Sequence, residues 1–178
     1  MQDADLFLEL AGIAGVFVGF GALIAVRSGG ASGRQEIGYT RGMVSSGVLT
    51  VVAALAPVTI ARYGLTGHQI WVLSSIVALT GLLVTTAAMA RTPEYRANWA
   101  AEIEAARTGS RPRWFVIADR VTTMLWSLAV LLIPIIIMLG VAPELEAALF
   151  STLVELFLLL AAWLLLALVY VQRLPESA

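Results

Sequence analysis

The chain has 178 residues, of which 60% are hydrophobic and 13% are charged, and its net charge is −1. Soluble domains carry about a quarter charged residues, so this composition excludes a water-exposed surface over most of the chain. The net charge gives no indication of a nucleic-acid partner, and the absence of cysteine excludes disulfides, thiolate nucleophiles and cysteine metal sites.

The first predicted element is a transmembrane helix over residues 6–26, an apolar run that follows an acidic start. A secretory signal peptide begins with basic residues, so we expect this segment to stay in the protein as a membrane span. Small side chains recur on one face of it, at Ala11, Gly15, Gly19 and Ala22. Such spacing lets a second helix approach closely, so we expect a helix-packing face toward the same chain or another copy. A backbone-lined ion path is the alternative.

That packing face predicts a contrast between substitutions in the first helix. Leucine at Gly15 or Gly19 should impair assembly or stability, because a bulky side chain forces two backbones apart. Leucine at Phe17 or Phe20, on the opposite side, should have a mild effect.

Four further apolar segments follow, over residues 43–61, 70–90, 121–141 and 147–170. Each has the roughly 20 apolar residues that a helix needs to cross the hydrocarbon core. None alternates polar and apolar residues as the strands of a membrane barrel do. We therefore predict an all-α membrane protein with five transmembrane helices, forming one membrane domain over residues 1–178.

Between the third and fourth spans, a short helix is predicted over residues 93–108. Tyr95, Trp99 and Ile103 fall four residues apart and form one narrow apolar stripe. This pattern is typical of a helix lying on the inner membrane face with its aromatic side chains at headgroup level. The alternatives are a helix that packs on the end of the bundle and one that docks a partner.

Orientation follows from the arginines, which are all eleven of the basic residues. Residues 27–42 hold three, residues 91–120 hold six and the C-terminal tail holds one, whereas Arg62 alone falls on the other side. Because cytoplasmic loops are enriched in basic residues, we predict an external N-terminus and a cytoplasmic C-terminus. The exclusive use of arginine over lysine indicates GC-rich codon usage, so the predicted location is a bacterial inner membrane.

The chain also matches itself at an offset of 77 residues, without gaps. Pro57 aligns with Pro134, and Ser74 with Ser151. The match predicts that the second and third spans and the fourth and fifth spans are copies of one helical hairpin. It also predicts helix kinks at Pro57 and Pro134 and hydrogen bonds between helices from the shared hydroxyl residues.

Glu155 lies within the fifth span, where ionisable side chains usually face the bundle interior and mark ion or proton pathways. The candidate ion or proton site consists of Glu155, Glu9, Ser74 and Ser151. The alternative is a hydrogen-bonded glutamate that ties helices together through Ser74, Ser75 or Ser151. Arg62 and His68 fall at the same outer surface and could line a vestibule with the two glutamates, or be unrelated to them.

An enzyme is the weakest hypothesis, because the predicted spans hold two acids on different helices and no histidine. We expect no catalytic site, cofactor or metal. The leading hypothesis is a structural or accessory membrane subunit, in a homo-oligomer or a larger membrane complex, that packs through its first helix. The alternative is a small oligomeric ion or proton channel or transporter that uses Glu155.

Overall fold

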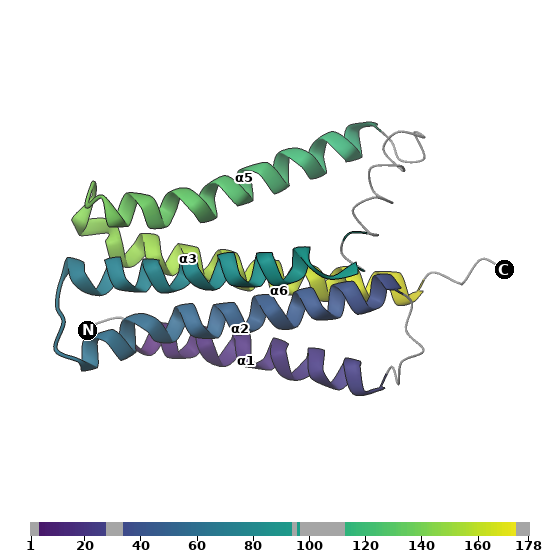
Figure 1. The fold of residues 1–178 in the computed structure, drawn as a ribbon, viewed down its shortest axis with the longest axis horizontal. Coiled ribbons are helices and arrows are strands. Elements are labelled where there is room, and N and C mark those ends of the chain that lie inside the picture. Colours follow the sequence, from purple (N-terminus) through teal and green to yellow (C-terminus); the bar gives the residue numbers. More distant parts are fainter. Residues whose placement is uncertain (1–3, 28–33, 94–95, 97–112, 174–178) are drawn as a thin grey trace.

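The computed structural model describes residues 4–27, 34–93, 96 and 113–173, and these segments contain helices and turns but no strand. The helices are α1 (Ala4–Arg27), α2 (Arg34–Arg62), α3 (His68–Ala90), α5 (Arg113–Met138) and α6 (Glu146–Arg173), with a 3-10 turn, η1 (Pro143–Leu145), before α6 (Figure 1). The predicted all-α class is confirmed.

Four of the described helices contain a stretch long and apolar enough to cross a membrane: Ala4–Ile24, Thr40–Arg62, His68–Ala90 and Pro143–Leu166. The apolar stretch of α5 is shorter and covers Met124–Met138. The predicted fourth span, residues 121–141, contains this shorter stretch, and its bounds as a membrane span stay a prediction.

Two helices begin earlier than predicted. α2 starts at Arg34 instead of residue 43, and α5 starts at Arg113 instead of residue 121. Hydropathy marks only the lipid-compatible part of a helix, whereas Arg, Gln and Glu extend a helix readily into a polar environment. Of the predicted helix over residues 93–108, only Pro93 and Arg96 are described, and both are helical; the rest lies outside the described residues.

α6 lies at the centre of the bundle and contacts α1, α2, α3 and α5. The core residues that these helices share are Phe7, Leu10, Ala11, Leu49, Ala53, Ala54, Ala78, Val130, Ile137, Phe150, Leu153, Val154 and Phe157. α5 supplies only Val130 and Ile137 to this cluster. It diverges from the other helices toward its Arg113 end, as Figure 1 shows.

The helix boundaries follow the 77-residue offset of the sequence repeat. Adding 77 to the bounds of α2, 34–62, gives 111–139, close to the observed 113–138 of α5. Adding 77 to the bounds of α3, 68–90, gives 145–167, which falls on α6. Pro57 and Pro134 are both buried inside continuous helices. The helix bounds therefore agree with the offset, while the duplication, the superposition and the kinks remain predictions.

The two ends of the bundle differ in charge. The helix ends at Arg27, Arg34, Arg113 and Arg173 all lie at one end of the long axis, and Arg62 lies at the other (Figure 1). The first described turn of α1 and the last of α6 are likewise at opposite ends. We name the end that carries the α2–α3 and α5–α6 connections the turn end.

Candidate functional site

A hydrogen bond between side chains joins α3 and α6 at the turn end. His68 is the first residue of α3 and Glu146 the first residue of α6, and His68 Nδ1 donates a hydrogen bond to Glu146 Oε1. The Glu146 side chain is 3% exposed, whereas that of His68 is 45% exposed. The first turn of a helix stabilises negative charge, so Glu146 is well placed at the start of α6. We name this contact the turn latch.

Gly140 shapes the α5–α6 turn beside the turn latch. Its φ of +61° is in the left-handed region, which glycine adopts without strain. A Cβ added to Gly140 would lie 3.4 Å from His68 Cε1, in ordinary van der Waals contact. The imidazole of His68 therefore packs directly on the α5–α6 turn, at a position where the backbone itself favours glycine.

Three aromatic rings cover the core beneath the turn latch. Phe7 of α1, Trp71 of α3 and Phe150 of α6 form a triangle with ring centroids 5.9–6.0 Å apart. Phe7 and Phe150 are fully buried. Tilted ring pairs at this separation stabilise a contact beyond their buried area. This aromatic triangle packs α1, α3 and α6 together near the turn end.

Two serine hydroxyls lie next along α3. Ser74 and Ser75 are fully buried, and neither hydroxyl has a hydrogen-bond partner among the described residues. Other hydroxyls in the bundle are paired: Ser46 Oγ of α2 donates to the Phe157 carbonyl of α6 at 3.0 Å. That contact confirms one of the predicted hydrogen bonds between helices.

The predicted ion site is not assembled in the structure. Glu155 and Glu9 are exposed on the outside of the bundle, whereas Ser74 is buried inside it. Ser151 is half-buried, and its hydroxyl donates to the Ala148 carbonyl of its own helix at 2.9 Å. The structure therefore contains neither a Glu155 directed into the bundle nor a tie from Glu155 to Ser74, Ser75 or Ser151.

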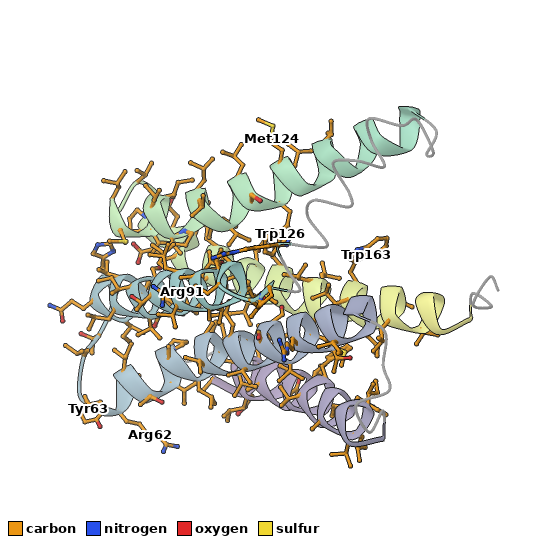
Figure 2. All side chains as sticks on the ribbon, turned by 45° about the vertical axis from the view of Figure 1, so that its right-hand side comes forward. Arg62, Tyr63, Arg91, Met124, Trp126 and Trp163 are labelled. Carbon is orange, nitrogen blue, oxygen red and sulfur yellow. The ribbon has the colours of Figure 1, made fainter. Side chains whose placement is uncertain are left out.

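Glu155 is outward because it belongs to the outer stripe of α6, whose members repeat every three or four residues. The exposed residues of this stripe are Thr152, Glu155, Leu159, Trp163 and Leu166. Figure 2 shows the Trp163 side chain pointing away from the ribbon. From the sequence, Glu155 is expected to face the bundle interior, because carboxylates in membrane helices usually do so. The packing of α6 instead leaves this side chain on the outside.

The predicted vestibule does not form around the two glutamates. Figure 2 shows Arg62 and Tyr63 at the turn end with side chains directed away from the bundle, and Tyr63 is 82% exposed. His68 pairs with Glu146, a residue that the sequence had placed in a connecting turn. The partner of the single histidine was thus missed.

The predicted small-residue face of α1 is not its packing face within the chain. Ala11 is buried, but Gly15, Gly19 and Ala22 are exposed, and a Cβ added at Gly15 or Gly19 would have no atom within 4 Å. We name the exposed residues Gly12, Gly15, Gly19 and Ala22 the open α1 face.

α1 instead approaches α2 through other glycines, which sequence reasoning missed. A Cβ at Gly47 would lie 2.8 Å from Val18 Cγ2 and 3.3 Å from the Ala14 carbonyl oxygen. A Cβ at Gly21 would lie 2.8 Å from Met43 Cε. Gly21 and Gly47 are the positions where these two helices depend on the absence of a side chain.

The turn latch predicts a test of stability. His68→Ala leaves the buried Glu146 carboxylate without its partner, so we expect the free energy of unfolding to fall by about 1–3 kcal/mol. Glu146→Gln retains an oxygen that can accept from His68 Nδ1 and should have a smaller effect. Thermal unfolding of the detergent-solubilised chain measures both, with Gln69→Ala as an exposed control on the same helix turn. Equal melting temperatures for wild type and His68→Ala would contradict a stabilising latch.

In its described part the chain has no group of three or more His, Cys, Asp or Glu side chains that could hold a metal ion. The described polar groups that the structure singles out are the His68–Glu146 contact at the turn end and the two buried hydroxyls of Ser74 and Ser75 that have no hydrogen-bond partner. No family model, curated protein or solved structure gives a significant match to the chain.

Proposed function

We propose that this chain is a structural or accessory subunit of a bacterial inner membrane, and that it self-associates through the open α1 face. The observation that carries the proposal is the exposure of Gly12, Gly15 and Gly19. No described atom outside the neighbouring backbone of α1 lies within 4 Å of a Cβ placed at any of them. Close helix contacts in lipid depend on such positions, because apolar area alone gives no preference for another helix over lipid tails.

The other side of α1 already uses small residues in this way. Ala14 and Gly21 meet α2 at Gly47 and at Met43, with no room for larger groups at the glycines. The open α1 face has the same four-residue spacing at Gly15 and Gly19. A second copy whose α1 packs on the open α1 face would bury helix backbone that otherwise faces lipid. Such a contact of one surface with itself has two-fold symmetry, which is the commonest symmetry of homo-oligomers.

Glu155 provides independent support for a covering partner. It lies near the middle of the apolar stretch Pro143–Leu166 and is exposed. A charged residue at the centre of a membrane helix costs about 2.5–3.5 kcal/mol on insertion scales. A partner helix or subunit that shields Glu155 from lipid would reduce this cost, whereas an isolated chain keeps it.

The proposed topology places the N-terminus outside and the C-terminus in the cytoplasm, with α5 as the fourth of five spans. The arginine-rich helix ends at one end of the bundle support it. A reporter fused after Ala178 should be active when it requires the cytoplasm and inactive when it requires the periplasm. The opposite pattern, or equal activity of both reporter types, would exclude five spans in this orientation.

Association is tested by the mass of the protein in lipid nanodiscs or mild detergent. We expect wild type at twice 19.0 kDa, and Gly15→Leu as a folded monomer, because the added side chain meets no described atom of another part of its own chain. Ile13→Leu, at a large exposed position of α1, is the matched control and should stay a dimer. A monomeric wild type at all accessible concentrations would refute self-association.

A further inference from the structure

The buried hydroxyls of Ser74 and Ser75 lack a hydrogen bond that a serine in a helix can make to its own backbone. A serine in a helix commonly donates to the carbonyl three or four residues earlier, and Thr50, Thr85 and Thr152 do so in this bundle. Ser74 and Ser75 do not, although both are fully buried. Buried polar groups without a partner are rare in proteins and usually mark bound water, an ion or a functional site.

The repeat sharpens the contrast. The residues 77 positions later are Ser151 and Thr152, and both hydroxyls donate to the Ala148 carbonyl at 2.9 Å. Hydroxyl residues in the same register therefore bond to their own helix in the second hairpin, where they are half-buried or exposed, and are unpaired and buried in the first. The surroundings of Ser74 and Ser75 in the first hairpin must therefore account for the difference in hydrogen bonding.

α2 offers an acceptor at the same depth. Pro57 has no N–H, so the Ala53 carbonyl cannot receive the usual helical hydrogen bond from four residues ahead. Ala53 and Pro57 are both buried. Ser74 lies six residues after the start of α3, and Ala56 lies six residues before the end of α2, so these antiparallel neighbours are level. Carbonyl groups in a helix point toward its C-terminal end, so the Ala53 carbonyl points toward the level of Ala56 and Ser74.

We infer that Ser74, Ser75 and the Ala53 carbonyl together bind internal water, which bridges α3 to the proline site of α2. Water both donates and accepts, so it satisfies hydroxyl donors and a free carbonyl at once, and buried waters typically make about three such bonds. A cation would satisfy only lone pairs, and among the carboxylates whose side chains the structure describes, Glu146 contacts His68 and Asp5, Glu9, Glu144 and Glu155 are exposed. Trp71 of the aromatic triangle is one helical turn from both serines, toward the turn end.

The test compares the two hairpins and does not depend on association. Ser74→Ala and Ser75→Ala should each lower the melting temperature of the detergent-solubilised chain by roughly 2–4 °C, because each removes a bond to the water. Ser151→Ala and Thr152→Val are matched controls and should change it little, because their hydroxyls serve only their own helix. An experimental structure that resolves ordered water should show density within hydrogen-bond distance of both Ser74 Oγ and Ser75 Oγ.

Three results would overturn the inference. A melting temperature raised by Ser74→Ala and Ser75→Ala would mean that the hydroxyls are buried without any partner. A stabilisation by sodium or potassium chloride over choline chloride that Ser74→Ala abolishes would identify a cation in place of water. If neither serine variant folds, an experimental structure of the wild-type protein tests the inference instead. No density for water beside Ser74 and Ser75, in a map that shows ordered water elsewhere, would refute the site.

Discussion

Gly47→Leu should destabilise the folded chain more than any other single glycine substitution in α1 or α2 apart from Gly21→Leu. Even a Cβ at Gly47 would lie 2.8 Å from Val18 Cγ2 and 3.3 Å from a backbone oxygen of α1, which cannot move without the helix. Overpacking of a filled contact costs about 1–3 kcal/mol and sometimes more. We expect a large drop in melting temperature, measured in detergent by thermal unfolding, and poor recovery of folded protein.

Gly15→Leu is the internal control for this result, because it makes the same chemical change on the outer side of α1, where nothing lies within 4 Å. It should leave the melting temperature of the monomer unchanged. Similar losses for Gly47→Leu and Gly15→Leu in the monomeric state would show that α1 does not pack on α2 through Gly47.

Glu155→Leu should improve membrane insertion of α6, because it removes an exposed ionisable group near the middle of an apolar stretch. The gain is about 3 kcal/mol on insertion scales, since the charged residue costs about 2.5–3.5 kcal/mol and leucine contributes about 0.3–0.6 kcal/mol favourably. An insertion assay that reports the inserted fraction of the α6 segment measures this directly. Thr152→Leu, in the same outer stripe, should give a smaller gain.

The same residue decides between the two functions considered for the chain. If the protein is a structural subunit, liposomes containing wild type or Glu155→Gln under a pH gradient should show no proton flux above empty liposomes. Flux through wild type that Glu155→Gln abolishes would favour the conduit, because glutamine cannot release a proton. The exposure of Glu155 excludes a pathway that uses this carboxylate inside a single chain, so flux would have to run along a contact between chains.

The helical class could be predicted because long apolar runs have few structures open to them in lipid, whereas four of the five predicted spans are long and apolar enough and the fourth is shorter. The hairpin register could also be predicted, since scarce residues such as Pro57 and Pro134 mark the 77-residue offset. Which side of each helix faces inward could not. Lipid-facing and buried positions are both apolar, so Gly15 and Gly47 have similar sequence surroundings although one is open and the other is tightly packed.

The turn latch could have been anticipated from the repeat alone. An offset of 77 places His68 opposite residue 145, directly before Glu146, so the two residues begin equivalent helices of the two hairpins. Composition drew attention to Glu155 because it interrupts an apolar run, whereas Glu146 lies at a helix start, where an acidic residue is common. The burial of Glu146 depends on how the α2–α3 connection packs against the α5–α6 connection, and a local sequence pattern does not predict that packing.

The central claim is that the open α1 face is a contact between copies, and cross-linking in native membranes tests it most directly. The chain has no cysteine, so Gly15→Cys introduces a single thiol. A disulfide requires Cα atoms within about 7 Å, a distance that two α1 helices packed through this face would reach. Under mild oxidation we expect a disulfide-linked dimer from Gly15→Cys and none from Val84→Cys, an exposed control on α3. No dimer from Gly15→Cys, or equal dimer from both variants, would contradict the account.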